Sequence, residues 1–508
     1  MAGELVVNLV IVLTIIYLVY WRWSRRRLMS MASELGSGVM ALPFVGHAYL
    51  FLGGGEARMK AFQILGRDAL RKGGITSYWL GTALFAMVAD PVVAEVVLKT
   101  CLEKDDVTEL TKTFIGNGSI FAPVSIWRRR RKVLLPNFGT KNLKHFVSIF
   151  AKQSGVMVDQ LKTDVGAGPI TMWKYFTAYT IDSIAEATLG FDMNAQTTSD
   201  QPMLKAFGDG FAICAERICK PWLHNDIIYS MMPVYKKLID YRDYLWCVFD
   251  EVSYLFIQTK RKQLKEIEHR NPADIDVLKT YLELLLEGRE GVTDVEVREE
   301  TMVIMMAGND TSAVGAAFVT LMLSRHQEVQ EKVYEELYEV FGESTRAATM
   351  ADLPRLRYLD AVVRETMRLY PPVPLIARKV EKDIILPSGV TLVPGSGVMV
   401  NIWALHRNPQ YWGGDAEVFH PERFLDADKH LAFMPFSHGP RNCLGYQFAM
   451  MSMKTALSSL LRHYKILPAT KPSSLQSGFP PLRLKFELMM KDVDDFQVQI
   501  VSRNSVYK

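Results

Sequence analysis

Cysteine is scarce in this chain of 508 residues, and the cysteines present do not form a structural framework. There are five of them, and no two form a Cys-X-X-Cys pair. An odd, sparse set excludes a disulfide scaffold and argues against a zinc module. We therefore expect the bulk of the chain to lie in a reducing compartment.

A strong charge of one sign and internal repeats are also lacking. The 59 basic and 55 acidic residues leave a formal net charge of +4, which gives no global basis for binding nucleic acid. No Walker motif, His-Glu-X-X-His motif or repeat occurs. Apolar residues make up 49% of the chain, which is enough for a large core and excludes a disordered protein. Because no internal linker divides the chain, we expect one large catalytic unit.

A single apolar run is long enough to cross a membrane, and it lies at the N-terminus. Residues 5–21 are nearly all apolar, and as a helix they would reach about 26 Å, close to the thickness of a thin bilayer. Aromatic and basic residues gather at the far end of this run, as in an interfacial belt. They are Tyr17, Tyr20, Trp21, Trp23, Arg22, Arg25, Arg26 and Arg27.

The positive-inside rule places such arginines, and everything after them, in the cytosol. We therefore expect residues 1–23 to be a single-pass anchor in the endoplasmic reticulum membrane. Residues 24–42 are then expected to be a linker and residues 43–508 a cytosolic catalytic domain. A buried core helix is the alternative interpretation of so short a run.

The remaining sequence is mainly helical from about residue 56 to 375, with few strand-like runs. A long helix with segregated strands indicates a mainly α (α+β) enzyme. The expected strands are residues 77–79, 85–88, 384–386, 398–402, and a hairpin made of 486–490 and 496–501.

One helix is especially clear. Thr293 and Glu296 form a capping box, and residues 302–323 are apolar on almost every face, which predicts a helix buried in the middle of the domain.

The segment from Phe436 to Gly445 carries the strongest chemical signal. It has the spacing Phe-X-X-Gly-X-Arg-X-Cys-X-Gly, and residues 446–461 then read as a helix. Cys443 therefore precedes a helix N-terminus, where backbone N–H groups stabilise a thiolate. A thiolate bound to haem iron needs such donors, Gly445 lets the backbone lie against a flat macrocycle, and Arg441 can pair with a propionate. Phe436 can shield the sulfur, although a lone cysteine is more often a small buried apolar residue.

This segment resembles the haem-binding loop of the cytochrome P450 family, the haem-thiolate monooxygenases, and the resemblance extends over residues 43–508. It implies the family fold, a large helical domain with small β-sheets following one N-terminal transmembrane helix. It also implies a non-covalently bound haem b whose axial ligand is the thiolate of Cys443.

Residues 307–311 (Ala-Gly-Asn-Asp-Thr) are similar to the oxygen-activation motif of that family. The resemblance implies that Thr311 contacts the dioxygen substrate and that Asp310 helps to deliver protons. A hydrogen bond from Thr311 to the carbonyl four residues earlier is the structural alternative. Related proteins often carry Glu at the position of Ala307, where it can become ester-linked to haem, and this chain cannot form that bond.

Three further elements are similar to the family pattern. Glu365 and Arg368, with Arg423 of Pro-Glu-Arg-Phe, would interlock behind the haem as structural support, although alone the first two would be a surface ion pair. Trp127, Arg131 and Arg378 match positions that face the haem propionates. The remaining charges of residues 128–132 are expected to point elsewhere, as a solvated face or as a docking surface for an acidic electron donor.

Residues 191–196 resemble a feature of the animal clan that includes fatty-acid ω-hydroxylases, and we identify the chain with microsomal, insect-like members of that clan. The expected function is hydroxylation or epoxidation of a lipophilic small molecule with dioxygen. No flavin or nicotinamide motif occurs, so electrons are expected from an NADPH-dependent flavoprotein reductase, with cytochrome b5 as a further donor. The alternatives are a haem-thiolate isomerase or dehydratase acting on peroxides and a non-catalytic haem sensor. By resemblance, residues 105–122, 205–240, 373–377 and 475–495 line the pocket.

Overall fold

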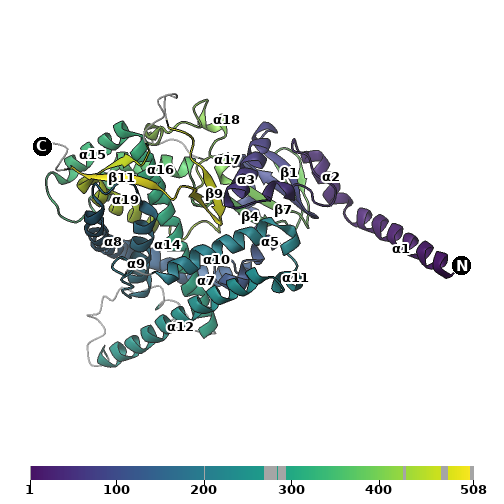
Figure 1. Cartoon of the computed structure of the whole chain (residues 1–508), viewed down its shortest axis with the longest axis horizontal. Helices are drawn as coiled ribbons and strands as arrows, with labels where there is room; N and C mark the ends of the chain where they lie inside the picture. Colours follow the sequence, from purple (N-terminus) through teal and green to yellow (C-terminus); the bar gives the residue numbers. More distant parts are fainter. Residues whose placement is uncertain are drawn as a thin grey trace.

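The computed structural model describes residues 2–198, 201–267, 283, 293–426, 431–470 and 479–503. Helices dominate, and the strands form four small sheets, as the sequence predicts (Figure 1). The α-helices are α1 (Ala2–Ser24), α2 (Arg26–Leu35), α3 (Gly55–Arg71), α4 (Pro91–Thr100), α5 (Asp106–Glu109), α6 (Lys112–Ile115), α7 (Val124–Leu134), α8 (Thr140–Leu161), α9 (Met172–Leu189), α10 (Pro202–Cys219), α11 (Asp226–Ser230), α12 (Pro233–Ile267), α14 (Asp294–Arg325), α15 (Gln327–Phe341), α16 (Arg357–Leu369), α17 (Ile402–Leu405), α18 (Pro409–Trp412) and α19 (Tyr446–His463). The strands are β1 (Ile75–Leu80), β2 (Ala83–Val88), β3 (Ile170–Thr171), β4 (Leu375–Lys379), β5 (Ile384–Ile385), β6 (Thr391–Leu392), β7 (Gly397–Asn401), β8 (Tyr464–Pro468), β9 (Leu484–Glu487), β10 (Met489–Asp492) and β11 (Gln497–Ser502).

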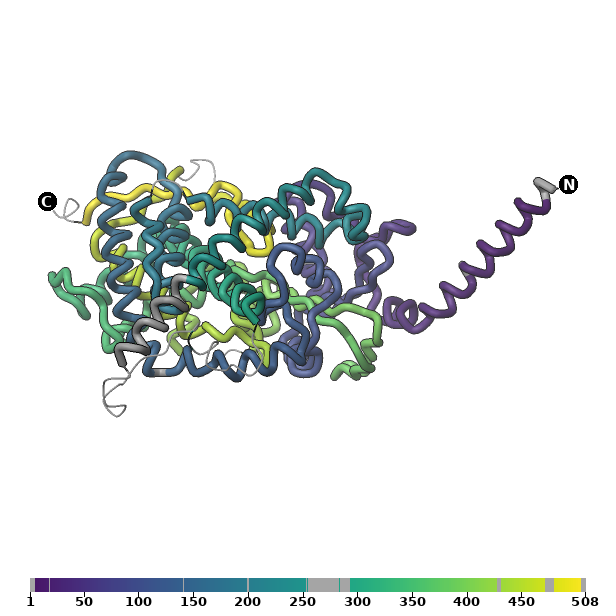
Figure 2. Tube along the Cα trace, turned by 90° about the horizontal axis from the view of Figure 1, so that it is seen from below, coloured from purple at the N-terminus to yellow at the C-terminus, as the bar shows by residue number. Residues whose placement is uncertain are grey.

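Helix α1 extends away from the body of the protein (Figures 1 and 2). Its segment Leu5–Ser24 has a mean hydropathy of 2.1 and is not buried against the rest of the chain. A bare apolar helix of this length is unfavourable in water, so α1 fits a membrane anchor. Among the described residues, helix α14 is also long and apolar enough to span a membrane, but 78% of its apolar window is buried, which makes it a core helix.

The expected linker, residues 24–42, contains a packed helix. Helix α2 buries Met31 and Leu35, and the hydroxyl of Ser77 on β1 donates to the carbonyls of Ala32 and Gly36. The segment has no glycine or proline before Gly36, so nothing interrupts an amphipathic helix that can pack on the sheet.

The largest sheet has the strand order β1-β2-β7-β4. Strands β2 and β7 are parallel, and the outer pairs are antiparallel. The sequence predicts β1, β2, β5 and β7 within a few residues, and it misses β4. That strand follows three prolines at 371, 372 and 374, which hide its pattern. Strand β4 is important because it carries Arg378 to the cavity described below.

The C-terminal hairpin is paired differently from the prediction. Strands β9 and β10 form a tight antiparallel pair that turns at Leu488, which has a positive φ of 63°. Strand β11 pairs instead with β8 and β3. Alternation of apolar residues identifies a strand but not its partner, and the segment 486–490 therefore contains a turn rather than one strand.

Helix α14 runs through the core and makes its most extensive contacts with α9. Its predicted capping box is confirmed: Thr293 Oγ1 accepts from Glu296 N, and Glu296 Oε2 accepts from Thr293 N. From Val297 to Ser324 most side chains are buried, as the apolar pattern predicts. Helix α19, predicted over 446–461, spans Tyr446–His463. The loop before α19 and the middle of α14 face the same cavity.

Candidate active site

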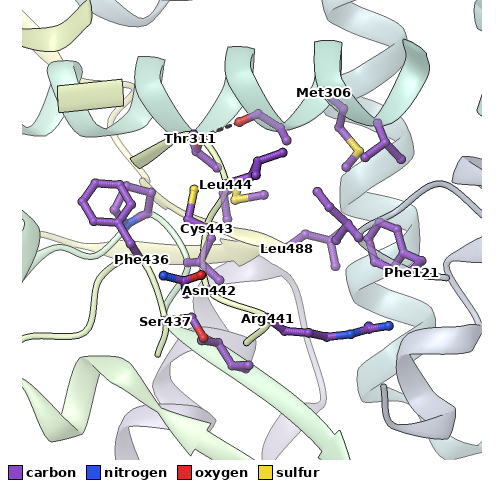
Figure 3. A pocket seen from close by; sticks show the side chains of 18 of the residues that line it. Phe121, Met306, Thr311, Phe436, Ser437, Arg441, Asn442, Cys443, Leu444 and Leu488 are labelled. Atoms are coloured by element: carbon purple, nitrogen blue, oxygen red, sulfur yellow. Dashed lines mark hydrogen bonds between the residues drawn. The ribbon is translucent and has the colours of Figure 1, made fainter. Parts of the chain in front are cut away.

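A cavity of about 430 Å³ lies between α14 and the loop that precedes α19. Figure 3 shows Cys443 pointing toward the helix that carries Thr311, while Phe436 and Arg441 lie on opposite sides of the cysteine. Nine of the ten predicted site residues line this cavity, and Asp310 does not. The nine are Trp127, Arg131, Ala307, Thr311, Arg378, Phe436, Arg441, Cys443 and Gly445.

The cysteine loop is fixed by contacts on both of its sides. Cys443 N donates to Phe436 O at 2.9 Å. Arg131 donates from Nη1 to Asn442 O at 2.8 Å and from Nη2 to Asn442 Oδ1 at 2.5 Å. Desolvation raises the pKa of the Cys443 thiol, and the backbone N–H of Gly445 and the charge of Arg131 oppose that effect by lowering it. Both opposing groups favour the thiolate that the sequence predicts.

Gly445 shows why a flat group fits beside this loop. A Cβ placed on Gly445 would meet no protein atom closer than 3.6 Å, so the protein's own packing does not demand a glycine here. The glycine leaves the backbone bare where it faces the cavity. The position therefore suits a macrocycle that lies close to the main chain.

Two buried arginines at the cavity edge have donors without acceptors among the described residues. Arg441 donates from Nη2 to Ala122 O at 2.6 Å, but its Nε and Nη1 have no partner, and neither has Nε of Arg378. Arg441 also lies with its Cζ 4.6 Å from the ring centroid of the buried Trp127. Burial lowers the pKa of each arginine to about 10. The charge of Arg441 adds to this lowering for Arg378, and the charge of Arg131 adds to it for Arg441.

Unmet buried guanidinium donors are costly, so this edge of the cavity fits an anionic group such as the carboxylates of haem. Lys104 lines the cavity too, and burial together with Arg378 and Arg441 lowers its pKa. Sequence reasoning missed Lys104 because it stands in the run Glu-Lys-Asp-Asp, which reads as an exposed charged turn.

The polar residues of α14 are divided between two sides of the helix. Thr311 lines the cavity, and its Oγ1 donates to Ala307 O at 2.5 Å, which is the back-bond considered as the structural alternative. Asp310 lies outside the cavity lining and is ion-paired with Lys491 of β10. Gly308 is required by packing, because a Cβ there would lie 2.7 Å from Ile184.

The predicted interlock of Glu365, Arg368 and Arg423 is confirmed. Arg368 donates from Nε and Nη2 to the two carboxylate oxygens of Glu365 at 2.7 and 2.8 Å, and Arg423 Nε lies 3.1 Å from Glu365 Oε1. The side chains of Glu365 and Arg368 are fully buried. His406 joins the cluster: its Nδ1 lies 3.0 Å from Arg368 O, and its Nε2 accepts from Met434 N. Burial and the charge of Arg368 lower the pKa of His406 to about 3, so it is neutral near pH 7.

The basic segment of α7 requires one correction. Arg128, Arg129 and Lys132 are exposed as expected, but Arg130 is buried. Arg130 lies 2.6 Å from Glu300 and 2.7 Å from Glu296, both on α14. A carboxylate on the facing helix draws this arginine inward, and only the packing of α7 against α14 reveals that partner.

A cysteine that faces an apolar cavity beside a buried helix, with unmatched cations at the rim, fits a site for haem held by a thiolate. The sequence model of the family Cytochrome P450 matches residues 37–488. The chain therefore belongs to the cytochrome P450 family and is a haem-thiolate monooxygenase, which binds iron protoporphyrin IX through a cysteine.

Curated relatives match over nearly the whole chain. Cytochrome P450 4c3 of Drosophila melanogaster is 31% identical over 96% of this chain and 93% of its own length. Cytochrome P450 4d2 of the same species is 31% identical over 92% of this chain and 95% of its own. Human Cytochrome P450 4V2 is 30% identical over 92% and 89%. The match to insect and mammalian proteins of this group confirms the resemblance to the animal clan.

Proposed function

We propose that the protein is a membrane-anchored monooxygenase that hydroxylates or epoxidises a lipophilic small molecule, with Cys443 as the iron ligand. The observation that carries this proposal is the place of Cys443 in the cavity. All five cysteines lie in described parts of the chain, and Cys443 is the one among them that lines the cavity. The other four are buried in the packing or, in the case of Cys247, exposed on α12.

The cavity wall supports a lipophilic substrate. Apart from the cations at one edge and a few hydroxyl groups, the cavity lining is apolar. A volume of about 430 Å³ lies in the range of small-molecule sites. Its apolar side chains include Ile120, Phe121, Val303, Ile304, Met306, Val373, Leu375, Leu488 and Met489. Fatty acids, hydrocarbons, hormones and foreign lipophiles share this chemistry. The apolar wall binds such a substrate and excludes water from the reacting carbon.

Haem bound to Cys443 supplies the oxygen chemistry, and the side chains around it bind, orient and protonate. Trp127, Arg378 and Arg441 would hold the propionates at the cation-rich edge. Phe436 screens the sulfur from solvent. Thr311 lines the cavity, and its hydroxyl, which donates to Ala307 O, would leave that hydrogen bond to donate toward the cavity. Asp310, which precedes Thr311 on α14 and lies outside the cavity lining, would supply protons.

Electrons are proposed to come from an NADPH-dependent flavoprotein reductase in the endoplasmic reticulum membrane, with cytochrome b5 as a further donor. Enzymes of the family use a redox partner, a substrate and dioxygen. The exposed Arg128, Arg129 and Lys132 of α7 support docking of an acidic donor, because complementary charge speeds encounter. The arginines after α1 support a cytosolic catalytic domain.

Reconstitution with reductase and NADPH against a panel of lipophiles, scored by product mass, tests the proposal. We expect NADPH-dependent addition of one oxygen atom. Conversion of a peroxide without NADPH would instead identify an isomerase or dehydratase, and haem reduction without product would identify a sensor.

The double variant Arg128→Glu/Lys132→Glu should slow reduction of the haem by the reductase at low salt and weaken the salt dependence of that rate. Lys141→Glu/Lys144→Glu, which reverses two exposed lysines on the next helix α8, serves as the charge-matched control.

Removal of the Thr311 hydroxyl is expected to divert electrons from product to peroxide. In Thr311→Ala the proton at Oγ1 is lost, and general acid catalysis by a positioned group contributes about 10²–10⁴-fold. We expect product per NADPH to fall at least about tenfold while substrate binding is retained. Thr311→Ser keeps the hydroxyl and should keep most of the coupling. Equal coupling in Thr311→Ala and the wild type would show that protons bypass this residue.

Haem is expected to leave the chain completely on denaturing acidic extraction. Ala307 lines the cavity with a methyl group, so no ester to the macrocycle can form at that position. The measurement is the haem content of the protein and solvent fractions after extraction. Haem that stays with the polypeptide would contradict a non-covalent site.

A further inference from the structure

A second cavity, of about 280 Å³, adjoins the main one, and Val107 of α5 lines both. Two chain segments divide their side chains between the cavities. Lys104 and Arg378 line the main cavity, whereas the residues that follow them, Asp105 and Lys379, line the second one. The second cavity is therefore a space of its own, with a different set of charged side chains.

Asp105 brings to this cavity a carboxylate with one unused oxygen. The residue is 5% exposed, and its Oδ1 accepts from Val107 N at 3.1 Å, as the N-cap of α5. Among the described residues, Oδ2 has no hydrogen-bond donor and Asp105 has no ion-pair partner. Oδ2 lies beside Gly397, which also lines the cavity, and a Cβ there would lie 2.5 Å from it. Because a buried carboxylate oxygen without a donor is costly, Oδ2 suits a donor that a ligand supplies.

The other charges around the second cavity compensate each other, so Asp105 sets its sign. Lys379 Nζ lies 2.6 Å from Asp106 Oδ1, which pairs one cation with one anion. His224 Nε2 lies 3.0 Å from Ile218 O, and burial lowers the pKa of this imidazole, so it is neutral near pH 7. Burial raises the pKa of Asp105 to about 6, so its carboxylate is mostly ionised at that pH. The cavity therefore carries a net negative charge and favours a cation.

The remaining wall of the second cavity is largely apolar. Leu84 and Phe85 of β2 line it, together with Val107 and Leu110 from α5 and its C-terminal end. An alkyl chain packed against these side chains is removed from water, which is favourable. A volume of about 280 Å³ is just below the range of sites for drug-sized ligands, so a ligand of a few carbon atoms fits.

We propose that this cavity is a second binding site, which takes a small primary alkylammonium ion through Asp105 Oδ2 and the apolar wall. The ammonium donates to Oδ2 and neutralises the buried carboxylate, while the alkyl chain packs against Phe85 and Leu110. A primary ammonium suits this oxygen better than a quaternary one, because it has N–H groups to donate. The site does not depend on the proposed monooxygenase reaction, so it is tested by binding alone.

The test measures thermal unfolding of the purified haem-loaded protein in butylammonium chloride and in potassium chloride of the same ionic strength. Butylammonium should raise the unfolding temperature of the wild type more than potassium does, because a ligand that binds only the folded state stabilises it. Asp105→Asn keeps an N-cap acceptor for α5 but loses the charge, so it should fold and bind butylammonium at least about tenfold more weakly. Glu109→Gln removes an exposed carboxylate of the same helix outside the cavity lining. It is the matched control and should bind like the wild type.

Affinity is measured by calorimetry on the reduced carbonyl complex, because amines also bind haem iron and the carbonyl ligand blocks that position. Lys379→Met keeps the inference testable if Asp105→Asn folds poorly. It removes the cation of the cavity wall, so butylammonium should bind severalfold more tightly than to the wild type. Equal stabilisation of the wild type by potassium and butylammonium would overturn the proposal. So would unchanged affinity in Asp105→Asn, or weaker binding in Lys379→Met.

Discussion

Cys443→Ser is expected to abolish the thiolate-type spectrum of the reduced carbonyl complex and to reduce product formation to background. A serine hydroxyl in this loop is not an anionic sulfur ligand, and the push of electron density from the thiolate to the iron is lost. The loop itself should keep its conformation, because its contacts are made by other atoms: Cys443 N to Phe436 O and Arg131 to Asn442. The change therefore isolates the ligand from the fold.

Cys247→Ser is the matched control, because this cysteine is exposed on α12 and its replacement should leave the spectrum unchanged. Absorbance of the reduced carbonyl complex, normalised to haem content, is the measurement. Retention of the thiolate-type band in Cys443→Ser would assign the iron to another cysteine.

Arg368→Ala is expected to destabilise the protein by about 3–5 kcal/mol, because it leaves the fully buried Glu365 without its bidentate partner. The loss extends beyond one ion pair. Arg368 also donates to the carbonyls of His406, Ala416 and Val418, which belong to the segments behind the cysteine loop. We expect this variant to accumulate poorly and to bind little haem.

Two further variants separate a buried network from a generic loss of charge. Arg368→Lys should also fail, because an ammonium cannot reproduce the five directed donors of a guanidinium. Arg364→Ala, on the same helix α16, removes a half-exposed arginine paired with Asp360 and should cost less than about 1 kcal/mol. Thermal unfolding and haem content are the measurements, and equal losses in Arg364→Ala and Arg368→Ala would refute the network.

The parts of the site that depend on short stretches of the chain were predicted correctly from the sequence. The spacing from Phe436 to Gly445 places a cysteine directly before a helix N-terminus, and α19 begins at Tyr446 as expected. The capping box at Thr293 gives the start of α14 to the residue. These features depend on neighbours within about one helical turn, whose geometry the backbone itself imposes.

Contacts between segments that are distant in the chain were not predicted from the sequence. The sequence predicted residues 486–490 and 496–501 as the two strands of one hairpin. The observed pairs are different, because alternation of apolar residues carries no information on which edge a strand meets. Residues 26–35 looked like a connector, and they became helix α2 because the sheet offers a surface for Met31 and Leu35. In both cases the deciding partner lies elsewhere in the chain.

Short-range patterns in the sequence were therefore sufficient to locate the cysteine loop, the polar residues 309–311 of α14 and the apolar helix α1. Which charged side chains are buried, and which partners they meet, depends on the tertiary structure. It turned Arg130 inward to Glu296 and Glu300, brought Lys104 to the rim beside Arg378 and Arg441, and placed Lys491 against Asp310. The physical reason is that the state of a charged side chain depends on its desolvation and on the opposite charge nearest in space, and for these residues that charge comes from a segment far away along the chain.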